Sequence, residues 1–365
     1  MNAGEYFLLI NLQFIHINTM QGYISRLAIA IAAISFAIPQ PTSAMPVNYS
    51  ISDLNSLTPR GYVRATGVNN LGQVVGTSTT SQRYYNNHAF MYVAGQIKDI
   101  DTFSGGKYSY AQDINDLGQA IGYWTNPSGN DRAFLYSEGK VTNISHGNKN
   151  VYAKGINNSG LVVGYFDNAS DDSHAFLYSD GKLNDLGTLG GKDSYANQIN
   201  DSGQVVGYSS TVSDQYRAFL YSSGKMADLG TLTGGDRSEA NSINKSGQVV
   251  GTSTTANGDS HAFIYSAGKM IDLGTLPKQA NSTAYGINDS GQIVGSSGNN
   301  RGTSTAFVYS AGKMIDLNSL LPANSGWFLA EAHDINNRGQ ITGTGVFHGK
   351  NSAFLFSPAG LNTDK

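Results

Sequence analysis

Apolar residues recur along this chain in short runs rather than at helical spacing. Runs such as Val-Val-Gly and Ala-Phe-Leu-Tyr have no clean polar face. Short continuous apolar runs bounded by turn residues are typical of strands that are buried on both faces. The pattern therefore predicts an all-β chain whose sheets are covered on both sides.

The runs belong to a unit that occurs seven times. It reads Ile-Asn-[Asn/Asp]-x-Gly-Gln-x-[Val/Ile]-Gly, then a variable stretch, then [His/Arg]-Ala-Phe-Leu-Tyr-Ser-x-Gly-Lys-Met-x-Asp-Leu-Gly-Thr-Leu. Its first Asn falls at Asn69, Asn115, Asn157, Asn200, Asn244, Asn288 and Asn336, at spacings of 46, 42, 43, 44, 44 and 48 residues. Such a period is typical of β-propeller blades.

Each unit contains four predicted strands, called a to d. In the fifth unit they cover residues 240–244, 248–252, 262–266 and 269–273. Gly ends the a–b turn in every unit and also marks the c–d turn, which predicts two tight hairpins and an antiparallel meander. A parallel β-helix is the rival fold, but its coils are shorter and lack two hairpins per period.

The strand count predicts a closed ring. Strand d follows only the first six c strands, and the missing one is found at the other end of the sequence, at residues 49–54. This segment can complete the seventh blade, which removes the edge that an open array would expose. The alternative is a degraded d strand near Leu361. We therefore predict a seven-bladed β-propeller of four-stranded antiparallel blades, closed by an N-terminal strand.

The N-terminal region has the features of a secretory signal peptide. Arg26 precedes an apolar run of 12 residues at 27–38, and small residues follow up to Ala44. We predict cleavage after Ala44, a secreted or periplasmic mature chain at residues 45–365, and translation from Met20. The alternative is an anchor helix, although the run is short for a stable membrane span.

Composition narrows the classes of function. The net charge is −3, only 13% of residues are charged, and no basic stripe is present, which argues against nucleic acid as a partner. The chain has no Cys, which excludes disulfides and thiolate chemistry. No catalytic or phosphate-binding motif occurs and no pair of carboxylates stands out, so we predict no cofactor and no metal site. We also expect a monomer.

The repeated motifs resemble the HAF-repeat family of extracellular bacterial proteins. The name-giving His-Ala-Phe triplet occurs at His88, His174 and His261, alongside Asp-Leu-Gly-Thr-Leu-Gly-Gly and Ile-Asn-Asp-Ser-Gly-Gln-Val-Val-Gly. The resemblance covers residues 49–357 and implies export and a bacterial origin, but no activity. Asn143 departs from the strand-d Asp, and four units replace the His with Arg132, Arg217, Thr305 or Ser352.

Two sets of residues are candidates for binding, and both are expected on the face that carries the variable b–c and d–a loops. The first set starts strand c and could line a polar pocket: His88, Arg132, His174, Arg217 and His261. The favoured alternative is that each side chain stabilises its own blade, because repeated residues usually support the repeated unit. The second set is aromatic and could stack on sugar rings: Tyr84, Tyr85, Tyr123, Trp124, Tyr165, Phe166 and Tyr208. Packing between blades is the favoured alternative for this second set.

The sequence favours a secreted binding protein for a glycan or an envelope protein. An enzyme acting on polysaccharide, as a lyase or hydrolase, and a structural surface protein are the alternatives. A unique polar cluster near the axis would favour the enzyme, whereas a broad aromatic or polar rim without one would favour binding. A repeated calcium site in the Asn-Asp-Ser-Gly turns is rejected, because no unit offers several carboxylates.

Overall fold

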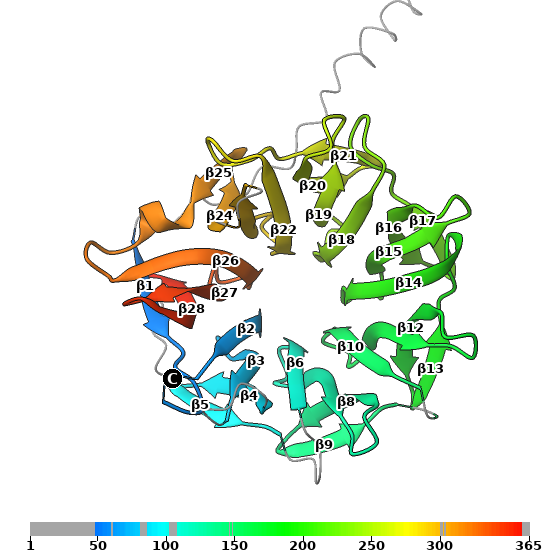
Figure 1. The fold of residues 1–365 in the computed structure, drawn as a ribbon, viewed down its shortest axis with the longest axis horizontal. Helices are drawn as coiled ribbons and strands as arrows, with labels where there is room; N and C mark the ends of the chain where they lie inside the picture. The colour runs from blue at the N-terminus through cyan, green and yellow to red at the C-terminus, as the bar shows by residue number, and fades with distance from the viewer. Residues whose placement is uncertain are drawn as a thin grey trace, which may run out of the picture. The chain divides into compact units, whose positions relative to one another are not determined.

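The computed structural model describes residues 48–59, 61–80, 86–101, 108–145, 147, 149–299, 302 and 304–359. The predicted signal peptide, Tyr84 and Tyr85 lie outside these ranges. Within them, seven four-stranded antiparallel sheets are arranged around one axis as the blades of a β-propeller (Figure 1). No helix in these ranges has the length and apolar character needed to cross a membrane.

The first four blades follow one another along the chain, each with its innermost strand first. Blade 1 consists of β2 (Val63–Val68), β3 (Val74–Thr79), β4 (Asn87–Val93) and β5 (Gln96–Asp99). Blade 2 consists of β6 (Tyr108–Ile114), β7 (Ala120–Thr125), β8 (Asp131–Ser137) and β9 (Lys140–Asn143). Blade 3 consists of β10 (Val151–Ile156), β11 (Val162–Asp167), β12 (Ser173–Ser179) and β13 (Lys182–Asp185). Blade 4 consists of β14 (Gly190–Ile199), β15 (Val205–Thr211), β16 (Tyr216–Ser222) and β17 (Lys225–Asp228).

The last three blades include the one that joins the two ends of the ring. Blade 5 consists of β18 (Ser238–Ile243), β19 (Val249–Thr254), β20 (Ser260–Ser266) and β21 (Lys269–Asp272). Blade 6 consists of β22 (Asn281–Ile287), β23 (Ile293–Gly298), β24 (Ser304–Ser310) and β25 (Lys313–Asp316), followed by the short 3-10 helix η1 (Leu317–Leu320). Blade 7 consists of β26 (Trp327–Ile335), β27 (Ile341–Phe347), β28 (Lys350–Pro358) and β1 (Tyr49–Asp53).

The predicted closure is confirmed. β1 pairs antiparallel with β28, from Tyr49 opposite Pro358 to Asp53 opposite Phe354. The Tyr49 ring stacks on Phe356 with 4.4 Å between centroids, which anchors the closing strand. The outer edge of β28 is therefore occupied by β1, and Leu361, the position of the alternative d strand, lies outside the described residues.

In blades 1 to 6 the a–b and c–d hairpin turns lie on the same side of the ring, because the strands alternate in direction. We call this side the turn face, and the side with the b–c and d–a loops the loop face. The glycines that end the a–b turns have φ between 72° and 80°, the left-handed region that glycine adopts at least cost. In the c–d turn of blade 5, both Ala267 (φ 50°) and Gly268 (φ 79°) are left-handed, as a two-residue hairpin requires.

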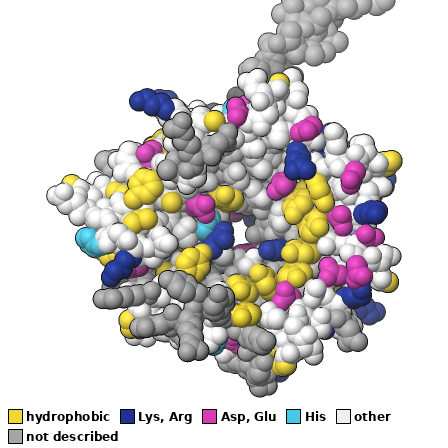
Figure 2. All heavy atoms as spheres, viewed as in Figure 1, with side chains coloured by type: hydrophobic (Ala, Val, Ile, Leu, Met, Phe, Trp, Pro, Cys, Tyr) yellow, Lys and Arg dark blue, Asp and Glu magenta, His cyan; other side chains and the backbone are white. Residues whose placement is uncertain are grey.

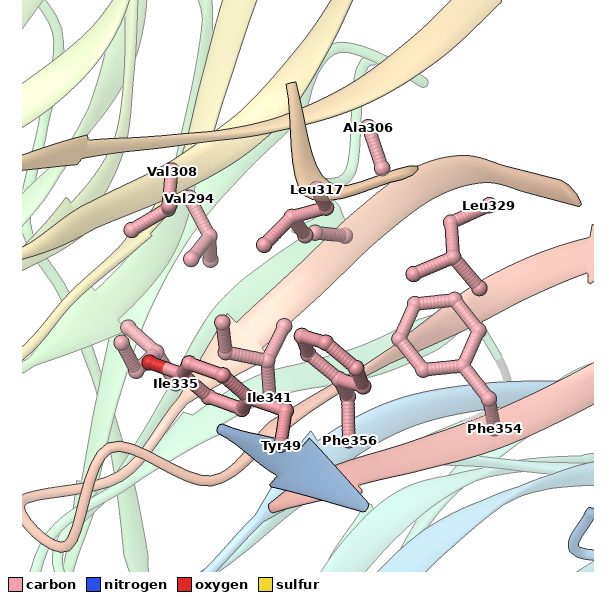
Figure 3. Close-up of a cluster of buried hydrophobic side chains, with 11 residues drawn as sticks. Tyr49, Val294, Ala306, Val308, Leu317, Leu329, Ile335, Ile341, Phe354 and Phe356 are labelled. Carbon is pink, nitrogen blue, oxygen red and sulfur yellow. The ribbon is translucent and has the colours of Figure 1, made fainter. Parts of the chain in front are cut away.

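The hydrophobic core lies between blades rather than inside one sheet, as the two-sided apolar strands predict. Figure 3 shows one such cluster, in which Val294 and Val308 of blade 6 face Ile341 and Phe356 of blade 7. Every c strand places its Phe in such a layer, with an exposed fraction of at most 1%. Burying each ring contributes roughly 2–3 kcal/mol, so the repeat is stabilised mainly by its neighbours.

The repeated Gly of strand b is required because a Cβ at this position would clash with the neighbouring strand. A β-bulge interrupts the pairing of the first two strands in all seven blades and brings the two backbones close together. A Cβ on Gly251 would lie 1.9 Å from the carbonyl oxygen of Glu239, where no side chain fits. The Gly of the Val-Val-Gly motif therefore permits the close approach of the backbones of strands a and b.

The first Asn of each a–b turn links its blade to the next. Asn69 Nδ2 donates to the carbonyl of Asn115, and the same bond recurs around the ring until Asn336 donates back to Asn69. These seven bonds measure 2.8–3.2 Å and form a complete cycle. The repeated Asn thus closes the ring at the turn face as well as shaping its own turn.

Candidate functional site at the loop-face mouth of the ring

The innermost strands present their least repeated side chains toward the axis. The second position of strand a, counted from its alignment with β2, differs between blades: Arg64, Tyr110, Tyr152, Tyr195, Glu239, Thr283 and Glu331. This position lies toward the loop face, because strand a runs from a d–a loop to an a–b turn. The side chains at the mouth of the ring on the loop face therefore differ in chemical type from blade to blade.

Six tyrosines from blades 2, 3 and 4 form what we call the tyrosine arc: Tyr110, Tyr123, Tyr152, Tyr165, Tyr195 and Tyr208. Each blade contributes one from strand a and its direct partner from strand b, and the paired rings stack at 4.6–4.9 Å between centroids. Edge-to-face contacts of 5.1 and 4.9 Å join the pairs across blades. Figure 2 shows hydrophobic side chains on this side of the central hollow, over β6, β10 and β14.

Four phenol groups of the arc have a raised pKa and stay protonated over the whole physiological range. Burial raises the pKa of Tyr165 to about 12, and burial likewise raises the pKa of Tyr123, Tyr152 and Tyr208. A neutral phenol can both donate and accept a hydrogen bond. The arc therefore offers half-buried aromatic surface together with neutral hydroxyl groups.

Apart from Thr283 of blade 6, the rest of the mouth is charged. Arg64 comes from blade 1, Glu239 from blade 5 and Glu331 from blade 7. Glu331 accepts a 2.9 Å hydrogen bond from His333, which lowers the pKa of the Glu331 carboxyl. Burial raises the pKa of Glu239, and the charge of Arg237 opposes this shift. The mouth is thus aromatic on one side and charged on the other.

Nearer the turn face, the innermost strands carry a pair of carboxylates. Asp113 and Asp334 occupy equivalent positions in blades 2 and 7, and Gly67 of blade 1 lies between them. Asp334 accepts hydrogen bonds from the backbone N–H of Val68 and of Ile335, at 2.9 and 2.8 Å. Burial, and then the charge of Asp113, raise the pKa of Asp334 to about 7. This pair was not predicted, because no motif joins positions so far apart along the chain.

Asp113, Asp334 and the a–b turns line a cavity of about 170 Å³. Its rim is a second hydrogen-bonded ring, in which the residue after each repeated Asn donates its N–H to the corresponding side chain of the next blade. Examples are Asn70 to Asp116 at 2.8 Å and Asn158 to Asp201 at 2.9 Å. The link from Asp201 to the next blade is missing because Lys245 has no acceptor oxygen.

Solved structures similar to this chain are β-propeller proteins. The Pyrococcus horikoshii acylaminoacyl peptidase matches 83% of this chain and 52% of its own, at 11% identity and a TM-score of 0.55. The β-propeller domain of the Trilobed protease from Pyrococcus furiosus, described as having an open velcro topology, matches 82% of this chain and 96% of its own, at 9% identity and a TM-score of 0.56. A puromycin hydrolase matches 85% and 53% of the two chains, at 11% identity and a TM-score of 0.52.

These likenesses show the fold. The chain spans about half the length of the peptidase and of the puromycin hydrolase. No protein-family model matches the chain, and no curated protein matches it. Closure by β1 distinguishes this ring from the open velcro topology of the Pyrococcus furiosus domain.

The residues predicted at the start of strand c do not converge on a pocket. His88, His174 and His261 each bond the strand-d Asp of their own blade at 2.7–2.8 Å. Arg132 and Arg217 donate to d–a loop carbonyls, those of Lys149 and Asp236. Strand c is the third strand out from the axis, so these side chains lie apart around the ring. Their geometry fits the alternative in which each stabilises its own blade.

The predicted aromatic set divides between the two faces of strand b. Tyr123, Tyr165 and Tyr208 belong to the tyrosine arc. Trp124 and Phe166 point the other way and pack against interblade cores, with Phe166 also contacting His174 edge-on at 6.3 Å. Alternation along a strand separates neighbours in this way. The partners of the arc on strand a were missed; the signal that could have found them is the variability of strand a between otherwise regular repeats.

Proposed function

We propose that this chain is an exported binding propeller whose ligand is a carbohydrate, held at the loop-face mouth by the tyrosine arc. The observation that carries the proposal is the arc itself, six tyrosines gathered over three neighbouring blades at positions where the repeat otherwise varies. Aromatic rings present apolar faces and polar tips together, which suits sugar rings. Support for export comes from the apolar run and small-residue site at residues 27–44.

A glycan array, followed by titration calorimetry of the strongest hit, tests this proposal. Tyr195 contacts Tyr165, Tyr208 and Tyr216, so Tyr195→Ala should break the arc between blades 3 and 4 and weaken binding at least about tenfold, or ~1.4 kcal/mol. Tyr221→Ala is the matched control, because it removes a half-buried tyrosine from the turn-face end of the same blade. An array without hits, or equal losses in both variants, refutes the proposal.

The second candidate is an enzyme acting on polysaccharide, and one observation favours it. Asp334 and Asp113 line the same cavity, and a carboxyl with a pKa of about 7 suits general acid–base catalysis. Both carboxylates are, however, engaged by backbone N–H groups of neighbouring strands. Turnover of a bound polysaccharide that Asp334→Asn abolishes would favour this candidate over simple binding.

A further inference from the structure

Lys154 projects toward the axis from the bulge of β10 and is largely withdrawn from water. Its Nζ donates to Gln112 Oε1 at 3.1 Å and lies 5.9 and 6.0 Å from the ring centroids of Tyr123 and Tyr165. Burial lowers the pKa of Lys154 to about 8. Among the described residues no carboxylate lies within ion-pair distance of this ammonium group. A partly desolvated cation therefore stands beside the aromatic arc without a counter-ion.

Arg64 provides a second cation near the axis. Its charge influences the pKa of Tyr123, Lys154, Tyr285 and Glu331, which belong to blades 2, 3, 6 and 7. Arg64 stands on β2, the innermost strand of blade 1, and lines one pocket together with Glu331 of blade 7. The Arg64 side chain is exposed and has no hydrogen bond to any described residue. Figure 2 shows Lys or Arg side chains within the central hollow.

The two cations repel each other; Glu331 interacts with Arg64, whereas no carboxylate of the described residues pairs with Lys154. The repulsion from Arg64 contributes to the lowered pKa of Lys154. Glu331 is hydrogen-bonded to His333, and Glu239 is influenced by Arg237 rather than by Lys154. An oxyanion placed between Arg64 and Lys154 would relieve this repulsion and would gain charge-assisted hydrogen bonds from both side chains.

We propose that the mouth binds a sugar that carries an oxyanion, a uronate in the first instance, with its carboxylate between Arg64 and Lys154 and its ring against the tyrosine arc. This inference rests on the proposed function, since it names the class of carbohydrate that the same site takes. Arg64 supplies a planar fork at the open end of the mouth. Lys154 supplies a point charge deeper in the ring, where the low dielectric constant strengthens its attraction for an anion.

Titration calorimetry at pH 7 with tetragalacturonate and its methyl ester tests the charge requirement, because the ester keeps the rings and removes the anion. Tetragalacturonate should bind at least tenfold more tightly than the ester. Lys154→Met and Arg64→Gln should each weaken tetragalacturonate binding about tenfold and change ester binding less than twofold. Lys225→Met is the control, since Lys225 is exposed on the outer strand β17 of blade 4. Melting temperatures of all variants establish that the ring still folds.

The outcomes separate this inference from the proposed function. Equal binding of acid and ester, or equal effects of Lys154→Met on both, overturns the uronate site while leaving a neutral glycan site in place. If neither compound binds but neutral glycans on the array do so with sensitivity to Tyr195→Ala, the proposed function stands and the inference falls. If nothing binds, both fall. Competition by millimolar sulfate or phosphate that abolishes binding in full shows a simple oxyanion site and overturns the role of the sugar.

Discussion

Replacing one asparagine of the inter-blade cycle should cost a large part of the stability of this protein. The side chain of Asn244 is 3% exposed and makes four hydrogen bonds. Its Nδ2 donates to Asn288 O at 3.2 Å and to Gln248 Oε1 at 2.8 Å. Its Oδ1 accepts from the backbone N–H of Ser246 at 3.1 Å and of Gln248 at 3.0 Å. At a net value of about 1 kcal/mol for each bond, Asn244→Ala should lower the free energy of unfolding by roughly 4 kcal/mol.

Urea unfolding, followed by tyrosine and tryptophan fluorescence, measures this loss as a shift in the midpoint at constant slope. Asn184→Ala is the matched control, because Asn184 is exposed and its side chain makes one 3.3 Å bond to Leu177 O. The control should lie within about 0.5 kcal/mol of the wild type. A loss below about 1 kcal/mol for Asn244→Ala would show that the turn re-forms without its side chain, and that the cycle is not a stabilising feature.

Three further predictions concern closure, backbone contact and pH. Gly251→Ala would place a Cβ 1.9 Å from a carbonyl oxygen and should prevent folding of blade 5, which would be seen as loss of soluble protein. Gly258→Ala is the control: its Cβ would meet open space, and the variant should remain soluble despite the positive φ of this position. Tyr49→Ala removes the ring stacked on Phe356 and should cost about 3 kcal/mol and speed proteolysis of the closing strand; unchanged cleavage would contradict the closing role. Folding raises the pKa of Asp334 from 3.8 to about 7, so the folded state binds this proton more tightly than the unfolded state does. The free energy of unfolding should therefore fall by about 2 kcal/mol from pH 5 to pH 7. Asp334→Asn should be less stable at pH 5 and should flatten this pH dependence; an unchanged pH dependence would refute the role of Asp334.

The fold was predictable because each sequence pattern that indicates a strand or a turn recurs through the seven repeats. Glycines in the a–b turns, apolar b and c strands and the spare strand at residues 49–54 all pointed to one closed ring, and the structure confirms it. The role of the repeated Asn was not predictable in the same way. A turn explains an Asn without any neighbour, and only the assembled ring reveals that Asn69 and its equivalents each bond the following blade.

The candidate site was predicted only in part, for a physical reason. Function was sought among conspicuous repeated residues and in the loops, and Tyr123 and Tyr165 were found because they follow the Val-Val-Gly or Ile-Gly pattern. Arg64 and Lys154 stand on the innermost strands of different blades, far apart in sequence, and only the assembled ring brings both to its central opening. The cleavage after Ala44 and the resemblance to the HAF-repeat family remain predictions.

The closing strand also sets the orientation of the ring when the protein is attached through one of its termini. Asn48 and Ala359 lie side by side, joined by a 2.8 Å backbone hydrogen bond, at the outer edge of blade 7. Since β1 begins and β28 ends at the turn face, chain added at either terminus departs from that face. A tether, a fusion partner or an immobilising tag would therefore hold the ring with its tyrosine-lined mouth directed outward, toward whatever diffuses past.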